Sequence, residues 1–442
     1  MNNVFFLRFR HLLDWLYLRF RRLLGWTQGG FAKRGFWFQI HWVVGAALGV
    51  VIAIVGVTGA ALSFRGEITN LLNRDVVYVE PNGGEPLALD ELLTKASAAL
   101  PNSRIGSISL FSDPTRTARL SVSDANSTNM RARGRTQYVN PYTAEVAPYK
   151  SMKGEAFFST MFSLHRWMGD STRTWGKQLV AAATVALIVL SLSGLYMYLP
   201  FMKHSFRKSL KVDFRQKGRI FLYRLHSAFG VWTLIFVLFM SFSGLWWSYG
   251  WYRDGLIWLS GVDPASMQRG APPPPTQAQG AAGTGAPMAD RGSRGAAEGA
   301  NRANSGEAIY RGMAKAYDLF RETVERDYTS VTIQAPQGGS IYSISYSPLN
   351  PAHSRASNQL QVDVEKNEVV KHVKYDDKTL GEKFISSIFP LHSGDFFGVT
   401  GLILFCVSSL VMALFAITGY MLYYERFIRN RKKKARWRIA RS

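Results

Sequence analysis

The stretch Tyr223–Tyr249 reads YRLHSAFGVWTLIFVLFMSFSGLWWSY, and it decides the fold class. Its uncharged part runs from Ser227 to Trp247. About 20 apolar residues, rising about 1.5 Å each, cross a hydrocarbon core of about 30 Å. His226 stands just before this run, and the pair Ser243 and Gly244 closes it. The stretch therefore predicts a membrane-spanning helix with a histidine at its entrance.

The same layout occurs four times in the chain. Each copy has a histidine before an apolar run and a glycine, preceded by Ser or Thr, at its end: His41 with Gly59, His165 with Gly194, His226 with Gly244, and His392 with Gly419. The separation is 18 residues in the first and third copies, 29 in the second and 27 in the fourth. Spans three and four therefore repeat spans one and two. We expect a mainly α membrane protein, with four transmembrane helices in a two-fold repeated bundle.

A glycine follows the histidine by four residues in three of the copies, at Gly45, Gly169 and Gly230. Residues i and i+4 lie on the same face of a helix. A glycine there would leave room for a flat group bound to the imidazole. The fourth copy departs from the pattern and has Gly394 and Gly398 instead.

Positive charge is concentrated at three places in this 442-residue chain, whose net charge is +23. Residues 1–35 and 201–220 each hold seven Lys or Arg, and residues 425–442 hold nine, with one acidic residue in each segment. Nucleic-acid binding is the other reading of such runs, but every cluster adjoins a predicted span. Retention on the cytoplasmic side and contact with anionic lipid explain all three together. We therefore predict an inner-membrane protein with both termini in the cytoplasm and no nucleic-acid partner.

This topology assigns each segment between the spans to one side of the membrane. The predicted segments, in chain order, are a cytoplasmic amphipathic helix (1–35), span one (36–65), a periplasmic module (66–160), span two with its preceding histidine segment (161–200), a cytoplasmic basic loop (201–220), span three (221–249), a second periplasmic module (250–390), span four (391–426) and a cytoplasmic basic tail (427–442). Both modules show helix and strand patterns, which predict small α+β folds. Residues 262–305 are rich in Gly, Ala, Pro and Ser and predict a disordered insert. His353 and His372 lie in the second module, where we expect surface residues.

Depth in the membrane decides how the four histidines pair. Odd spans run outward and even spans run inward, so His41 and His226 lie near one face and His165 and His392 near the other. An isolated histidine at a membrane interface is commonly a hydrogen-bonded structural residue. Four histidines in matching positions instead indicate two sites, each with two imidazoles from two helices of the bundle.

The residue types around these histidines narrow the choice of metal. The embedded parts of the spans hold no Asp or Glu, apart from Asp395 at the mouth of span four, which argues against di-iron carboxylate and zinc sites. The lone cysteine, Cys406, supports neither an iron–sulfur cluster nor covalent haem attachment. Haem held non-covalently by two histidines fits best. Arg166 and Arg224 adjoin the ligand positions and could pair with haem propionates; interfacial anchoring is the alternative role.

The four-span layout, with its LHR and LHS motifs and its Thr-Gly or Ser-Gly exits, resembles the PepSY-associated transmembrane family over residues 35–427. The resemblance implies that the soluble modules have PepSY folds. It also implies two b-type haems, one on His41 and His226 and one on His165 and His392, that pass electrons across the inner membrane. Characterised relatives include a haem-containing reductase that releases iron from siderophores in the periplasm. The Gly- and Pro-rich insert departs from the pattern and leaves the substrate open.

Two functions of different classes follow. The first is an electron conduit that reduces a ferric complex, with a ferric siderophore as the substrate class that the resemblance suggests. The chain has no G-x-G-x-x-G after a strand and no P-loop, so the electron donor must be another protein or a diffusible carrier such as a quinone. The second is a non-enzymatic binding or regulatory membrane protein, since PepSY modules are also associated with peptidase inhibition. Aromatic residues at the outer end of span three either contact a substrate or form an interfacial belt: Trp246, Trp247, Tyr249, Trp251 and Tyr252.

Overall fold

The computed structural model describes residues 34–81, 83–124, 135–147, 152–263, 294–325, 327–336 and 339–439. The chain forms two compact units. The first comprises residues 1–64, 157–253 and 391–442, and the second comprises residues 65–156 and 254–390. The predicted amphipathic helix at 1–35, apart from Arg34 and Gly35, and most of the predicted insert, residues 264–293, lie outside the described residues.

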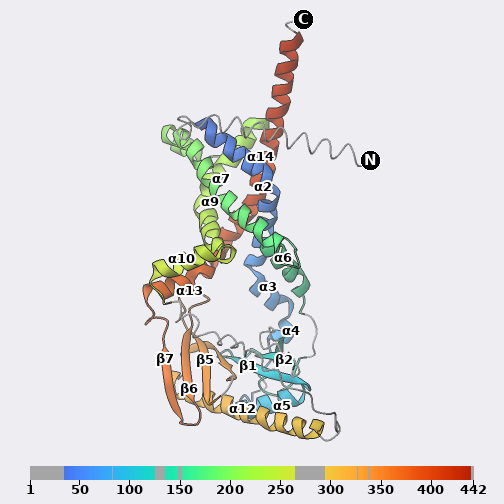
Figure 1. Cartoon of the computed structure of the whole chain (residues 1–442), viewed down its shortest axis with the longest axis vertical. Coiled ribbons are helices and arrows are strands. Elements are labelled where there is room, and N and C mark those ends of the chain that lie inside the picture. The colour runs from blue at the N-terminus through green and yellow to red at the C-terminus, as the bar shows by residue number, and fades with distance from the viewer. Residues whose placement is uncertain are drawn as a thin grey trace, which may run out of the picture. The chain divides into compact units, whose positions relative to one another are not determined.

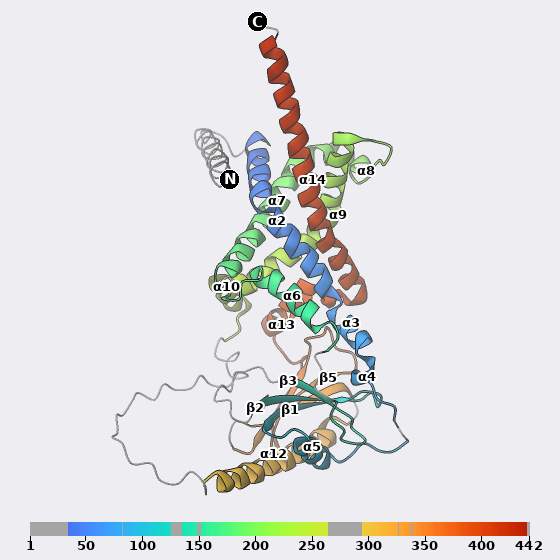
Figure 2. The ribbon, with the colours of Figure 1, turned by 90° about the vertical axis from the view of Figure 1, so that its right-hand side faces the viewer.

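The first unit is a bundle of four long helices (Figures 1 and 2). They are α2 (Arg34–Ser63), α7 (Trp175–His204), α9 (Gly218–Ser248) and α14 (Gly398–Ile439). Each has a segment long and apolar enough to cross a membrane. Helix α2 packs against α7 and α14, and α9 packs against the same two helices. Short elements precede or follow the spanning helices: α6 (Glu155–Trp167), α8 (Phe206–Ser209) and the 3₁₀ turn η1 (Asp395–Phe397). Two further helices, α10 (Gly250–Ser260) and α13 (Leu380–Ser393), begin or end in this unit and lie mainly in the second.

Small residues bring α2 and α14 close together. A Cβ atom added at Gly56 would lie 2.5 Å from the carbonyl oxygen of Ser409, and one at Gly49 would lie 3.2 Å from the hydroxyl of Tyr420. That hydroxyl donates to the carbonyl of Ala46 at 2.9 Å. Close backbone approach at small residues is the usual basis of helix association in lipid, where apolar burial supplies little driving force.

The second and fourth histidines do not lie on the spanning helices. His165 is on α6 and His392 is near the end of α13, both of which stop before the next span begins. Left-handed residues end these helices: Met168 (φ 52°) and Gly169 (φ 77°) follow α6, and Gly394 (φ 86°) follows α13. Gly169 is therefore beyond the helix, and the expectation that it shares a helical face with His165 is wrong.

Asp170 holds the turn between α6 and α7. Its carboxylate accepts hydrogen bonds from the hydroxyl of Thr172 and from the backbone N–H groups of Thr172, Thr174 and Gly176. Burial raises the pKa of this carboxyl, but the bonds to Thr172, Gly176 and Thr174 outweigh burial and lower the pKa to about 2. A Cβ at Gly176 would overlap the carbonyl of Trp167, so the start of α7 lies directly against the end of α6.

The second unit is built on one antiparallel sheet in the order β3-β2-β1-β4-β5-β6-β7. The strands are β1 (Ser103–Phe111), β2 (Ala118–Asp124), β3 (Arg135–Val139), β4 (Tyr328–Gln334), β5 (Ile341–Pro348), β6 (Asn358–Asp363) and β7 (Glu368–Val373). The two soluble segments thus share a sheet: β1 pairs with β4, with Ile108 opposite Ile333. This junction gives both strands a hydrogen-bonded neighbour in place of an open edge.

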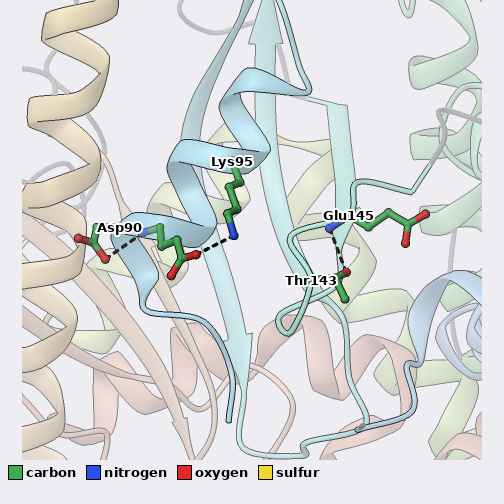
Figure 3. Close-up of polar contacts among 5 residues, drawn as sticks. Asp90, Lys95, Thr143 and Glu145 are labelled. Carbon is green, nitrogen blue, oxygen red and sulfur yellow. Dashed lines mark hydrogen bonds and ion pairs between the residues drawn. The ribbon is translucent and has the colours of Figure 1, made fainter. Parts of the chain in front are cut away.

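Helices α5 (Leu89–Ala98) and α12 (Arg294–Val324) cover one face of this sheet and contact each other (Figures 1 and 2). Alternating strand residues point into the core beneath them, as in β2, where Ala118, Leu120 and Val122 are buried. Helix α12 starts earlier than expected, because residues 294–305 of the predicted insert are helical. Two short helices, α3 (Arg65–Leu72) and α4 (Arg74–Val77), precede α5. On the exposed side of α5, Lys95 and Glu91 form an ion pair of 2.6 Å (Figure 3).

The two histidines of the second soluble segment are not equivalent. His353 is buried, so its prediction as a surface residue is wrong. Its Nε2 lies 2.9 Å from the hydroxyl of Tyr375 and 3.1 Å from that of Ser387, and its Nδ1 accepts from the backbone N–H of Arg355. This network satisfies both ring nitrogens, as a buried imidazole requires. His372 is half-buried and pairs with the hydroxyl of Tyr346 at 2.7 Å.

Gly312 tests how closely α12 packs on the sheet. A Cβ at this position would lie 2.1 Å from the hydroxyl oxygen of the buried Tyr342. We expect Gly312→Ala to destabilise the protein by about 1–3 kcal/mol, because the Tyr342 ring must move. Gly306→Ala on the same helix is the control, since its Cβ meets no atom closer than 3.8 Å and alanine favours helix. The measurement is the thermal unfolding midpoint of the full chain in detergent. Equal midpoints for the two variants would contradict this packing.

Asp170 predicts a pH dependence of stability. Its pKa is lowered by folding, so its contribution is fully present above the unfolded-state pKa of about 3.9 and is lost as the pH falls through about 2. We expect the unfolding midpoint of the original chain to exceed that of Asp170→Asn by a constant amount from pH 7 to 5. The difference should shrink below pH 4. A difference that does not depend on pH would show that the charge of Asp170 is not the stabilising feature.

Candidate functional site

Two histidine pairs lie inside the bundle, with the partners that the topology predicts. The rings of His41 on α2 and His226 on α9 have their centres 6.2 Å apart, at an interplanar angle of 76°. The rings of His165 on α6 and His392 on α13 are also 6.2 Å apart, at 67°. Each pair joins one histidine from the first half of the chain to one from the second half. All four side chains are half-buried.

Each Nδ1 atom is held by a hydroxyl on a different helix. His41 contacts Ser193 at 2.9 Å and His226 contacts Thr418 at 2.7 Å. His165 contacts Thr58 at 3.2 Å, and His392 contacts Ser243 at 3.0 Å.

The His165–His392 pair has a second anchor on each Nδ1. The backbone carbonyl of Val55 lies 2.9 Å from Nδ1 of His165, and that of Met240 lies 3.0 Å from Nδ1 of His392. Among the described residues, none makes a hydrogen bond to Nε2 of any of the four histidines.

These contacts decide the tautomer of every ring. A carbonyl can only accept, so Nδ1 of His165 and of His392 carries the proton. At His41 and His226 the hydroxyls already donate backward along their own helices, from Ser193 to Leu190 at 3.2 Å and from Thr418 to Leu414 at 2.7 Å. A hydroxyl that donates to this carbonyl accepts from the imidazole, and this arrangement puts the ring proton on Nδ1. Every Nε2 then has a free lone pair, which is the form of histidine that binds a metal.

The glycine after each of these hydroxyl residues makes room for the imidazole. A Cβ added at Gly59 would lie 3.0 Å from Cε1 of His165. A Cβ at Gly194 would lie 3.2 Å from Cε1 of His41, and one at Gly244 would lie 3.3 Å from Cε1 of His392. A Cβ added at Gly419 would lie 3.9 Å from Cε1 of His226. The Ser-Gly or Thr-Gly pair is thus a receptor for a histidine: the hydroxyl binds Nδ1 and the missing side chain admits the ring. From the sequence alone these pairs are recognisable only as markers of helix ends, because the local pattern does not indicate which histidine each one meets.

The glycines four residues after the histidines differ from one another. A Cβ at Gly230 would meet nothing within 4 Å, and one at Gly45 would meet only a methyl of Leu190 at 3.7 Å. Space is therefore open beside Gly230, four residues after His226, whereas the position of Gly45 is in ordinary contact with Leu190.

The two pairs lie at two levels of the bundle. Fourteen residues separate His41 from Val55 on α2, and fourteen separate His226 from Met240 on α9, which corresponds to about 21 Å along each helix. A buried apolar cluster packs around Phe405 and Met240 in the same bundle. Within it, the ring centres of Phe236 and Phe405 are 5.5 Å apart. Outside this cluster, the ring centre of Phe415 lies 5.2 Å from that of His226.

Cations and aromatic rings adjoin both levels. The guanidinium of Arg166 lies 5.9 Å from the rings of Trp167 and of Trp247, and Trp247 is 5.2 Å from His392. The guanidinium of Arg224 lies 4.5 Å from the Phe201 ring. Among the described residues, neither arginine forms an ion pair with a carboxylate.

Comparison with known proteins agrees with this architecture. A search of curated proteins finds no match to the chain. The family model described as the PepSY-associated TM region matches residues 38–426, which include all four spanning helices and all four paired histidines. The chain has four helices long and apolar enough to span a membrane, and it belongs to the PepSY-associated transmembrane family as a multi-pass membrane protein.

Proposed function

We propose that this protein is a di-haem electron-transfer protein that reduces a ferric complex, with a ferric siderophore as the substrate class. The observation that carries the proposal is the pair of two-imidazole sites, each with its Nδ1 atoms anchored and its Nε2 lone pairs free.

The separation of the rings suits a shared metal ion. Two metal–nitrogen bonds of about 2 Å place the centres of opposed imidazoles roughly 6 Å apart. Both observed separations are 6.2 Å. In the described part of the chain, no third His, Cys, Asp or Glu completes a metal-binding group with either pair. Each histidine pair would hold the iron of one haem, whose porphyrin would supply the other ligands.

The surroundings of the pairs also suit haem. Metal-ligating histidines usually donate their other N–H to a carbonyl, a carboxylate or water, which orients the ring and raises its basicity. In this protein, hydroxyls and backbone carbonyls would accept that N–H. Arg166 and Arg224 would neutralise propionates, and the open space at Gly230 would receive the edge of a flat group. When bound, the haems would each carry one electron.

The direction of transfer follows from the proposed topology. The basic segments favour an orientation with His41 and His226 toward the cytoplasm and His165 and His392 toward the periplasm. A protein or diffusible carrier on the cytoplasmic side is oxidised, and each electron converts one Fe³⁺ of a periplasmic chelate to Fe²⁺. Siderophores hold Fe²⁺ more weakly, so the iron is released. The ring pair of Phe236 and Phe405 in the apolar cluster of the bundle would place polarisable side chains between the two levels and exclude water.

Absorption spectroscopy tests the proposal. Protein purified from haem-replete cells should show low-spin bands that sharpen on reduction, with two haems per chain by pyridine haemochrome. Dithionite-reduced protein, mixed without oxygen with a ferric hydroxamate chelate, should reoxidise and yield Fe²⁺ that ferrozine traps. Colourless protein would contradict haem binding and would favour the alternative, a non-enzymatic binding or regulatory protein. Coloured protein that does not reduce the chelate would support the two haem sites but contradict the proposed ferric substrate.

Substitution of one axial ligand should empty one site alone. We expect His226→Ala to remove about half of the bound haem, because one centre loses its paired ligation while His165 and His392 are unchanged. The measurement is haem per chain, with the reduced spectrum of the remaining centre. The matched control is His204→Ala, at the exposed end of α7, which should keep both haems. Loss of both haems, or of neither, in His226→Ala would contradict the pairing.

The hydroxyl anchors predict a second effect. Thr418→Val keeps the shape of the side chain but removes the acceptor for Nδ1 of His226. We expect haem retention at this site to fall by about 10–100-fold, the usual cost of losing such a partner. Thr418→Ser restores the hydroxyl and should restore retention. Haem dissociation to an acceptor protein such as apomyoglobin measures both variants. Equal dissociation rates for Val and Ser would show that the hydroxyl does not hold the ligand.

A further inference from the structure

Helix α10 carries an apolar face that no part of the described chain covers. Trp251, Trp258 and Leu259 are 71%, 82% and 74% exposed. Spacings of seven and eight residues place these side chains on one side of the helix. The opposite side is different: Leu256 and Ile257 are half-buried, so α10 is packed on one face and bare on the other.

Helix α13 lies against the end of α10 and adds to this surface. A Cβ at Gly381 would fall 1.9 Å from the carbonyl oxygen of Ser260, so the two backbones touch (Figure 1). Close by, Leu380 is 86% exposed and Phe384 follows it by one turn, also exposed. Large apolar side chains gathered in this way on a protein surface mark an interaction site.

The chain on either side indicates what covers the surface. Only Tyr249 separates the end of the spanning helix α9 from the start of α10. Only Gly394 separates the end of α13 from the segment Asp395–Arg429, which is apolar enough to span a membrane. Both helices thus begin or end where a span leaves the hydrocarbon layer. Tryptophan is enriched at this depth, where its ring meets both acyl chains and headgroups.

We infer that α10 and α13 form an interfacial helix pair (Trp258, Leu259, Leu380 and Phe384) that lies in the headgroup layer with its apolar face against lipid. Such a helix binds through the apolar area it buries at the boundary of headgroups and acyl chains. This contact is independent of any haem. It would fix the ends of α9 and α14, and with them His392, at the membrane surface.

Site-directed spin labelling tests the inference in the full chain. The protein has one cysteine, so Cys406→Ser gives a background for single labels at Trp258→Cys, Leu259→Cys and Leu380→Cys. Leu349→Cys, on the residue after β5 and 52% exposed, is the control. The protein is reconstituted into phosphatidylcholine–phosphatidylglycerol nanodiscs, and only variants that elute as a single species are compared. Power saturation measures the access of O₂, which dissolves in lipid, and of a polar nickel chelate, which stays in water.

We expect the three labels to be severalfold more accessible to O₂, and less accessible to the nickel chelate, than the label at Leu349. Nickel access equal to that at Leu349 would place the surface in water and overturn the inference. Low access to both reagents would mean that another protein or a second copy of the chain covers it, which also overturns the inference.

Discussion

The hydrogen bond from each imidazole Nδ1 to a hydroxyl on another helix is the constraint on which the bundle depends. The hydroxyl on α7 holds the histidine of α2, and the hydroxyl on α2 holds the histidine of α6. The second half of the chain has the same exchange between α9, α13 and α14. Rotation of one spanning helix by a single residue would turn a hydroxyl away from its partner. The orientation of the four rings is therefore tied to the mutual register of the helices.

This arrangement also meets the demands of a lipid environment. A polar side chain in hydrocarbon must find its partners within the protein. Each hydroxyl here donates to a carbonyl of its own helix and still accepts from an imidazole, as Thr418 does with Leu414 and His226. No charged group is needed to orient the rings. The glycine after each hydroxyl lets the ring approach the helix backbone, so one dipeptide supplies both the bond and the space.

The soluble unit solves a different problem, which is how to join two segments that are separated by two spans. Each segment brings a helix and an antiparallel set of strands, and the first strands of the two sets, β1 and β4, pair side by side. The shared core beneath the sheet takes residues from both, among them Leu93 of α5 and Phe320 of α12. Chain segments far apart in sequence are thereby held as one folded body.

Hydrophobic length and charge in the sequence determined the four spans, and their alternating direction determined which histidines could meet. The pairs His41–His226 and His165–His392 follow from that direction alone, because depth in the membrane depends only on position along the chain. Strand and helix patterns likewise indicated α5 and six of the strands, but they missed β2 (Ala118–Asp124). Only the tertiary structure decided that His165 and His392 lie on separate short helices, since left-handed residues at 168, 169 and 394 end them. It also decided the hydroxyl partners of the imidazoles, the burial of His353 and the joining of β1 to β4. These are contacts between residues distant in sequence, and no local pattern records which distant atoms will lie within 3 Å of one another.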